Sequence, residues 1–501
     1  MTERTVLGID IGTTAVKVIL ISPEGKIVAE SNQPHDLLSL HPGWAEENAG
    51  KWWTNTLAGI ADINSRFPEL VEKICCIGVS GMVPAIVMLD EDGVPVRNSI
   101  QQNDARSVDQ IDRLKNEIDQ KELYELTGGV TNQQHILPRI LWIKENEPEV
   151  WKKVRTVCGS YDYIAWKLSG VKTLEINWAV ESGAFDIRKR EWLADQLEHY
   201  GIPVSLFPPV NDSMAVIGET KPDFAAETGL KGGIPIIAGS ADHVASTLAA
   251  GIIDEGDLLI KFGGAGDILY CTETLKTSDR LFIDFSDVPG KYLINGCMAA
   301  SGSLVKWFTN DICRSEDPDV LRKMDDEAAK LPPASEGLVI LPYFLGEKTP
   351  IMDPNARGIL YGLTLSHTRA HIFRAILEAV IYGFRHHVEV IKELGFAPKQ
   401  IIATNGGAKS RFWCQIAADV LNRDIIAYPA HPGSALGVAF LAAKAAGVFE
   451  NWSDIRLFLT ESRHFTPNPE AVRVYDKAYR IYRELYTSLL PLNAELGSLY
   501  E

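Results

Sequence analysis

The chain has few cysteines and no long hydrophobic run. Its 501 residues include seven cysteines, an odd number without a Cys-x-x-Cys pair, which disfavours a disulfide framework or a thiolate zinc site. The longest apolar run, residues 435–443, is much shorter than the about 20 residues that cross a bilayer. The first residues also lack the basic and apolar regions of a signal peptide. We therefore expect a cytoplasmic protein that does not associate with membranes.

Clustered positive charge is also missing. Lys and Arg number 49 against 66 Asp and Glu, a net charge of −17, and no basic run is longer than residues 188–190. Because nucleic acids and anionic membranes are bound by clustered Lys and Arg, we expect neither as a partner. Any phosphate bound here must be held largely by backbone amides and a metal ion.

Two common phosphate-binding motifs are absent. No Gly-Lys pair is followed by Ser or Thr, which excludes a P-loop NTPase, and no G-x-G-x-x-G occurs. Strands joined by glycine-rich turns are present instead. The pattern at residues 5–21, with its turn at 10–14, occurs again at residues 257–271, with its turn at 263–266.

This repeated pattern predicts an α/β fold of two related halves that face one cleft. We place the first domain at residues 1–245 and the second at residues 246–501. We expect the last helix, over residues 469–489, to be able to pack back on the first domain.

Three glycine turns are candidates for holding a nucleotide. Glycine lets the backbone approach a phosphate, and consecutive amides and hydroxyls offer hydrogen-bond donors. The candidate residues are Gly12, Thr13 and Thr14; Gly263 and Gly264; and Gly406, Gly407 and Ala408. Asp10, beside the first turn, could orient Mg²⁺ through water. Each turn alone also fits an ordinary tight turn, but a nucleotide has to be held at several points, so three such turns favour one.

Asp242 is the acid that stands out, because it follows the strand-like residues 234–237 and opens a helix of small residues. It can be a helix N-cap, or a base that accepts the proton of a substrate hydroxyl. His367 and His371 have two-His metal spacing but lack the Glu of H-E-x-x-H, which makes them weak metal candidates. We expect His386 and His387 on a solvated helix surface.

Several segments together resemble the FGGY family of carbohydrate kinases, most closely its xylulose-kinase-like branch. They are residues 8–14 (GIDIGTT), 41–46 (HPGWAE), 343–350 (YFLGEKTP), 358–378 and 405–410 (NGGAKS). The resemblance spans nearly the whole chain, and residues 358–378 fit a family signature at every constrained position.

The resemblance implies an actin-like, hexokinase-like fold of two ribonuclease-H-like domains, with ATP and Mg²⁺ in the cleft and, by analogy, a homodimer. It makes Asp242 the catalytic base and Asp10 the acid that supports Mg²⁺ and phosphate. It assigns Gly263 and Gly264 to a second phosphate turn, and Gly406, Gly407 and Ala408 to the nucleoside turn. Lys17 joins Gly12, Thr13 and Thr14 around the first turn.

Departures from the family pattern concern the sugar more than the chemistry. Xylulose kinases typically have Gln-Met-His-Gly at residues 82–85, where this chain has Met82, Val83, Pro84 and Ala85, and Asp-Asn where it has Asp242-His243. Asn103 and Asp104 survive from the sugar loop. We therefore interpret Met82, Val83, Pro84, Asn103, Asp104 and His243 as substrate-binding positions that select the sugar. Gly264 replaces the family's usual Thr, which removes one hydroxyl donor to the nucleotide.

The prediction is ATP-dependent phosphorylation of a hydroxyl of a small ketose or polyol, with a pentulose such as xylulose favoured. Two alternatives remain open from the sequence. One is an actin-like structural ATPase, which would share the turns but not the signature at residues 358–378. The other is a sugar-binding regulator that has lost turnover.

Overall fold

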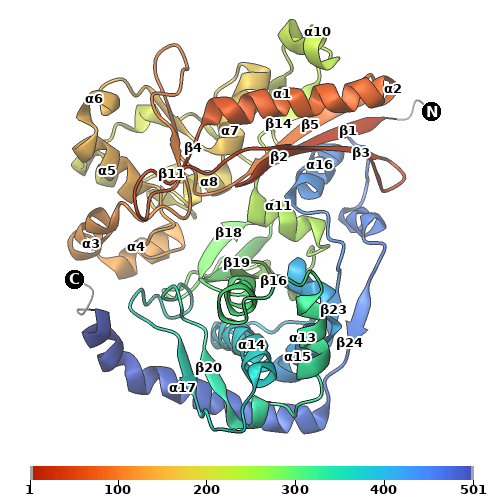
Figure 1. Cartoon of the computed structure of the whole chain (residues 1–501). Coiled ribbons are helices and arrows are strands. Elements are labelled where there is room, and N and C mark those ends of the chain that lie inside the picture. The colour runs from red at the N-terminus through yellow and green to blue at the C-terminus, as the bar shows by residue number, and fades with distance from the viewer. Residues whose placement is uncertain (1–3, 498–501) are drawn as a thin grey trace.

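The computed structural model describes residues 4–497, which form two halves that each contain a seven-stranded sheet (Figure 1). The strands of the first half are β1 Thr5–Ile11, β2 Ala15–Ser22, β3 Lys26–Pro34, β4 Glu46–Glu47, β5 Ile74–Gly81, β6 Val87–Leu89, β7 Ser99–Ile100, β8 Thr156–Cys158, β9 Leu174–Glu175, β10 Phe185–Asp186, β11 Glu191–Trp192, β12 Val210–Asn211, β13 Val216–Glu219, β14 Pro235–Ile237 and β15 Ser240–Ala241. Its helices are α1 Ala49–Arg66, α2 Pro68–Val71, α3 Val108–Glu117, α4 Gln120–Thr127, α5 Leu137–Asn146, α6 Pro148–Trp151, α7 Ser160–Ser169, α8 Ile176–Val180, α9 Ala194–His199, α10 Ala225–Thr228 and α11 Asp242–Ala249.

The second half follows in the chain and lies below the first in the view of Figure 1. Its strands are β16 Asp257–Phe262, β17 Gly266–Thr272, β18 Phe282–Phe285, β19 Tyr292–Met298, β20 Val339–Leu341, β21 Ile359–Tyr361, β22 Gln400–Thr404, β23 Ile425–Ala427 and β24 Arg463–Phe465. Its helices are α12 Gly302–Trp307, α13 Val320–Ala328, α14 Arg369–Glu393, α15 Arg411–Leu421, α16 Ser434–Ala445 and α17 Pro469–Gly497.

The two large sheets share one topology, which confirms the predicted α/β fold with two related halves. In the first sheet, β3, β2 and β1 form an antiparallel meander, β5 and β14 continue it in parallel, and β13 closes the edge antiparallel. In the second sheet, β19, β17 and β16 form the meander, β22 and β23 continue in parallel, and β24 closes the edge antiparallel. The equivalent hairpins, β1–β2 and β16–β17, carry the first two glycine turns.

The helix that crosses between the halves is α16, not the last helix. α16 packs against α11 and against β1, β2 and β5 of the first sheet. Its residues 435–443 are all buried, because a helix that is apolar on every side needs cover on every side. Gly78 makes this possible, since a Cβ there would lie 2.5 Å from the carbonyl oxygen of Val438.

The last helix, α17, instead packs against α15 and β20 of the second half. Its apolar stripe contributes Tyr475, Tyr479 and Tyr482 to the core of that half. The expectation that α17 packs back on the first domain is therefore wrong, because this one-sided stripe is already covered. None of the helices between residues 4 and 497 is long and apolar enough to span a membrane.

Candidate active site

Two adjoining cavities lie between the halves, and they share two residues. The first, of about 470 Å³, is lined from the first half by residues such as Val83, Pro84 and Asn103. The second, of about 500 Å³, is lined largely by residues 405–409 and 429–434 of the second half. Asp242 and Lys261 line both cavities. A group bound in one cavity and a group bound in the other would therefore meet at these two side chains.

Asp242 is the first residue of α11, and Ala241 precedes it at the N-cap position. Oδ1 of Asp242 accepts a hydrogen bond of 2.7 Å from the backbone amide of His243, and the Asp242 side chain is 34% exposed. The interpretation of Asp242 as an N-cap is therefore wrong: strand β15 extends to Ala241, so Ala241 takes the N-cap position, and the Asp242 side chain bonds only the next amide. The carboxylate is free to face the cavities.

Asp10 lies near the end of β1 and completes an acidic pair with Asp242. Ser80 on the neighbouring strand β5 donates to its Oδ1 at 2.9 Å. Burial and, next, the charge of Asp242 raise the pKa of Asp10 to about 6. A carboxylate whose ionisation is disfavoured by a second carboxylate is a place where a divalent cation would be stabilising, so Asp10 and Asp242 fit Mg²⁺.

Lys261 supplies positive charge where the two cavities meet. It lies on β16, and its Nζ is 3.2 Å from Oδ2 of Asp267 on the paired strand β17. Burial disfavours the ammonium form, but Asp267 and Asp242 outweigh it and raise the pKa of Lys261. The sequence motifs did not single out this lysine. Its only signal was its place just before the turn at Gly263.

The first glycine turn connects β1 to β2, as predicted. The amide of Gly12 donates to the carbonyl oxygen of Ala15 at 3.1 Å, Thr13 is partly buried, and Thr14 is exposed. Lys17 lies on β2, and its Nζ is 3.5 Å from Glu30 on β3. None of these four predicted nucleotide ligands lines either cavity, so their role stays a prediction.

The second glycine turn joins β16 to β17 and packs on the start of α12. The carbonyl oxygens of Gly263 and Gly264 accept hydrogen bonds from the amides of Gly302, Ser301 and Ser303. A Cβ at Gly264 would meet no heavy atom within 4 Å. The structure therefore has room for a threonine side chain at position 264, and packing does not require glycine there.

The third glycine turn forms a short 3-10 helix between β22 and α15. Gly406 lines the second cavity, whereas Ala408 is buried. A Cβ at Gly407 would lie 2.5 Å from Phe262, whose ring stacks on Trp413 at a centroid distance of 4.9 Å. Gly407 is thus needed for packing, whatever it contributes to a ligand.

The second cavity fits the phosphates and sugar of a nucleotide. Lys261 and Lys409 offer positive charge, and Ser246 and Ser434 offer hydroxyls. The backbone at Gly433 is open to the cavity, since a Cβ there would meet no heavy atom within 4 Å. The two lysines and the two hydroxyls of the cavity wall suit an anionic, polar ligand.

The first cavity is rich in side-chain amides suited to a polyhydroxylated ligand. Gln102, Gln133, Gln134 and Asn295 line it together with the predicted Asn103. Val83, Pro84 and His243 also line it, as the sequence predicted. Met82 does not: it is 1% exposed, and its carbonyl oxygen accepts from Ser160.

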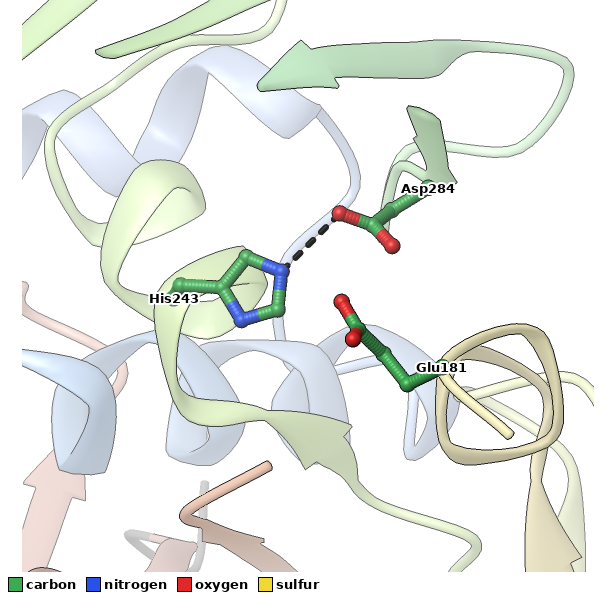
Figure 2. Close-up of side chains that lie close together, drawn as sticks. All are labelled: Glu181, His243 and Asp284. Atoms are coloured by element: carbon green, nitrogen blue, oxygen red, sulfur yellow. Dashed lines mark hydrogen bonds and ion pairs between the residues drawn. The ribbon is translucent and has the colours of Figure 1, made fainter. Parts of the chain in front are cut away.

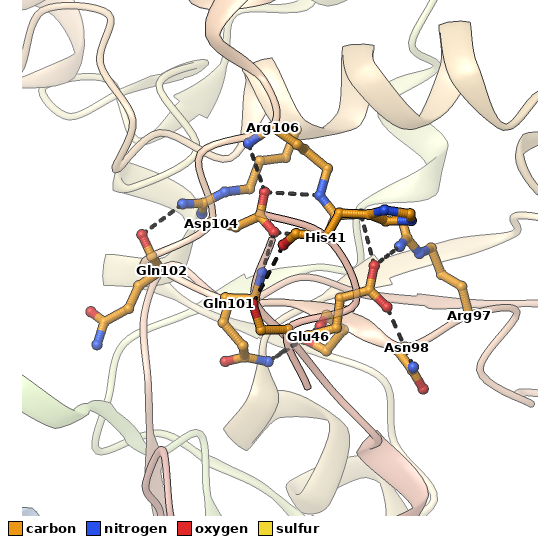
Figure 3. A network of polar contacts seen from close by, with 12 residues as sticks. His41, Glu46, Arg97, Asn98, Gln101, Gln102, Asp104 and Arg106 are labelled. Carbon is orange, nitrogen blue, oxygen red and sulfur yellow. Dashed lines mark hydrogen bonds and ion pairs between the residues drawn. The ribbon is translucent and has the colours of Figure 1, made fainter. Parts of the chain in front are cut away.

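Asp104 is also absent from the cavity wall and holds the loop that carries Asn103 (Figure 3). Its side chain, 0% exposed, accepts from the amide of Ala45 at 2.6 Å and from the guanidinium of Arg106 at 2.7 and 2.8 Å. Arg106 in turn donates to Glu46 at 2.7 Å and lies 3.8 Å from the ring centroid of Trp44. The structure therefore gives Asp104 a supporting role in place of the predicted direct contact.

The four histidines of α14 and the segment before it, which the sequence singled out, lie outside both cavities. His367 and His371 each accept a backbone N–H through Nδ1, at 2.8 and 3.1 Å. His386 and His387 are 6% and 0% exposed, so the expectation of a solvated surface is wrong. α14 runs through the core, and burial lowers the pKa of His387 to about 4.

Glu181, His243 and Asp284 meet beside the first cavity (Figure 2). Sequence reasoning found His243 but missed the two acids. Glu181 follows α8 and Asp284 lies on β18, where no motif marks either residue. Only the folded chain brings them to within 4.8 Å of one another and of His243.

The fold and the two cavities define a two-lobed enzyme of the phosphotransferase class, with two adjoining polar cavities between its halves. The N-terminal domain model of the FGGY family of carbohydrate kinases matches residues 5–249, and the C-terminal domain model matches residues 275–446. The chain belongs to this family, and it is a carbohydrate kinase that uses ATP and Mg²⁺ to phosphorylate a hydroxyl of a small-molecule sugar.

Named relatives match over nearly the full length. The chain is 31% identical to a xylulose kinase of Bacillus subtilis, over 99% of both chains. It is 26% identical to a gluconokinase of the same species, over 96% of this chain and 95% of the other. The crystal structure of a xylulose kinase from Rhodospirillum rubrum superposes with a TM-score of 0.93 at 42% identity, covering 98% of this chain and 100% of the other. The match to ribonuclease-H-like sugar kinases agrees with the predicted fold class.

Proposed function

We propose that the chain phosphorylates a pentulose such as xylulose, with Asp242 as the general base. The observation that carries this proposal is the position of Asp242 and Lys261 in the walls of both cavities. A sugar hydroxyl in the first cavity and a terminal phosphate in the second would meet there. Phosphoryl transfer depends mostly on such positioning and on charge stabilisation.

Each residue at this junction has a separate task. Asp242 accepts the proton of the attacking hydroxyl, and its exposed carboxylate is available for that hydrogen bond. Lys261 stabilises negative charge on the transferred group. Asp10 and Asp242 are the acids that would hold Mg²⁺, which neutralises charge on the phosphates when bound. Gly406 and Ser434 line the cavity that would receive the rest of the nucleotide.

The choice of a pentulose rests on the chemistry of the first cavity and on the named relatives. Its amide side chains and Glu181 pair with hydroxyl groups, and its volume of about 470 Å³ suits a small sugar. Both the Bacillus subtilis relative and the Rhodospirillum rubrum structure carry the name xylulose kinase. The gluconokinase relative makes gluconate the competing acceptor to test.

The deciding experiment compares acceptors and one variant. We expect ADP release with Mg-ATP to be fastest with xylulose in a panel of pentuloses, hexuloses, polyols and gluconate. Asp242→Asn should bind ATP as before and lose turnover by about 10²–10⁴-fold. Preference for gluconate would overturn the substrate, and near-normal turnover of the variant would overturn the base. Tight sugar binding without any turnover in the unmodified protein would favour the regulator.

Further proposals concern organisation. We propose a division of the kinase near residue 245, just inside α11, because the repeated sheet pattern restarts at β16. We also propose a homodimer acting in the cytoplasm, where ATP is available. Sedimentation of the purified protein tests the dimer, and cell fractionation tests the location.

A further inference from the structure

Three ionisable side chains from three separate elements meet beside the proposed base (Figure 2). His243 is the second residue of α11, Asp284 lies on β18, and Glu181 follows α8. Nε2 of His243 is 2.9 Å from Oδ2 of Asp284. Nδ1 of the same ring is 3.6 Å from Oδ1 of Asp242. The imidazole therefore stands between two carboxylates, one of which is the proposed base.

Acidic groups on several elements surround the His243 ring. Asp284 is hydrogen-bonded to Nε2 at 2.9 Å, and Asp242 lies 3.6 Å from Nδ1. The charged and titratable groups that face it are Asp242 on α11, Asp284 on β18, Asp287 after β18, Glu181 after α8 and Asp267 on β17.

Asp284 is itself fixed in place, so it can hold the His243 ring in one orientation. It is 1% exposed, and Asn295 on the paired strand β19 donates to its Oδ2. Its other oxygen, Oδ1, is buried and accepts no hydrogen bond among residues 4–497. Strands β18 and β19 belong to the second sheet. Asp284 therefore holds the His243 ring from the second half of the protein.

Glu181 is the side chain that can donate a hydrogen bond to the unpartnered Oδ1 of Asp284. Figure 2 shows its carboxyl group directed toward Asp284. Burial and, next, the charge of Asp284 raise the pKa of Glu181 to about 8, which favours its protonated form. A protonated Glu181 can donate to Oδ1 of Asp284, while Oδ2 of Asp284 accepts from Asn295 and lies 2.9 Å from Nε2 of His243.

We propose that His243, clamped by Asp284, is a positioning residue that holds the Asp242 carboxylate in the orientation needed to receive the proton of the sugar hydroxyl. The backbone amide and Nδ1 of His243 both face Oδ1 of Asp242. This leaves Oδ2 of Asp242 for the substrate. The inference rests on the proposed role of Asp242 as the base, and it adds two residues that act through that base.

The test uses His243→Asn, Asp284→Asn and the double variant in the full-length protein, with His464→Asn as the control. His464 is exposed on β24, away from both cavities. We expect each single variant to lower kcat about 10–100-fold and to leave the KM for ATP within about twofold. The double variant should be no slower than the slower single variant, because the two residues act as a unit.

Other outcomes would overturn the proposal. One is a kcat within about twofold of the unmodified protein in either single variant. Another is a loss of kcat that comes with an equal loss in the control or with additive effects in the double variant. A third is binding of one Mn²⁺ per chain without nucleotide that disappears in Asp284→Asn, which would make the cluster a metal site. If Asp242→Asn keeps its turnover, the proposed base fails. If only Asp242→Asn loses turnover, the base stands and the role of His243 fails.

Discussion

The carbonyl oxygen of Ala245 occupies the space that a side chain at Gly437 would need, since a Cβ there would lie 1.8 Å from that oxygen. Ala245 lies on α11, three residues after Asp242, and Gly437 lies on α16. The two helices touch backbone to backbone between the halves. The position of α16 therefore sets the position of the helix that carries the proposed base.

Gly437→Ala should destabilise the protein and lower turnover, because the added methyl forces α11 and α16 apart. Overpacking of this kind costs about 1–3 kcal/mol, and contact with backbone puts the effect at the upper end. Thermal unfolding of the variant measures it. Gly264→Ala is the matched control, since that position is open and its melting temperature should not change. Equal melting temperatures for the two variants would contradict this prediction.

Most of the architecture could be predicted from local patterns. The meander of β1–β3, the helix α14 and the turns at Gly12 and Gly263 all follow from periodicity and glycine placement. The choice between α16 and α17 as the crossing helix could not be predicted, because it depends on which surfaces remain uncovered after folding. α16 is apolar on every side, and that signal was present but was interpreted only as too short to span a membrane.

The site was predictable only where residues belong to a motif. Asp242 and Gly406 line the cavities as the motifs implied. Lys261, Glu181 and Asp284 come from strands and a helix end without any motif. Long-range packing places Lys261 at the cavities and brings Glu181 and Asp284 to His243. For Asp104 the motif marked a residue near the cavity but gave it the wrong contact. Its side chain accepts from Arg106 instead of lining the cavity, and so supports the loop that carries Asn103.

Lys261→Met should reduce kcat about 10²–10³-fold, because it removes the positive charge at the junction of the cavities. Lys17→Met is the informative comparison, since the sequence predicted Lys17 as a nucleotide ligand. The structure pairs Lys17 with the exposed Glu30, an ion pair that contributes about 0–1 kcal/mol. Steady-state kinetics of both variants should therefore show a large loss for Lys261 and a small one for Lys17. A larger loss for Lys17 would restore the original assignment.

Asp10→Asn should stabilise the protein at pH 8 in EDTA, although it abolishes turnover. The pKa of Asp10 is raised from 3.8 to about 6, so the fold disfavours the carboxylate form. Stability from this group is present below about pH 4 and is lost as pH rises through about 6, at a cost of about 2–3 kcal/mol. The variant escapes that loss. Thermal unfolding at pH 8 and pH 4 should show a gain at pH 8 that shrinks at pH 4, and a less stable variant at pH 8 would contradict the assignment.

Arg106→Lys should raise the KM for the sugar and leave the KM for ATP unchanged. Lysine cannot reproduce the paired hydrogen bonds to Asp104 or the stacking on Trp44. The loop bearing Asn103 should then lose its fixed position beside the first cavity. We expect an increase of about tenfold in the sugar KM, corresponding to about 1.4 kcal/mol. Arg113→Lys, at a half-exposed ion pair with Glu145, is the control and should change neither constant.

Gly264→Thr should tighten nucleotide binding by adding the hydroxyl that the family resemblance predicts in the second glycine turn. A Cβ at this position meets nothing within 4 Å, so the side chain can be added without displacing the turn. One hydrogen bond to a charged group contributes about 1.5–3 kcal/mol, so a KM for ATP lower by about 10–150-fold is expected. Gly264→Val has nearly the same shape without the hydroxyl and should not reproduce the gain. Equal effects of the two substitutions would show that shape, and not the hydrogen bond, controls affinity at this turn.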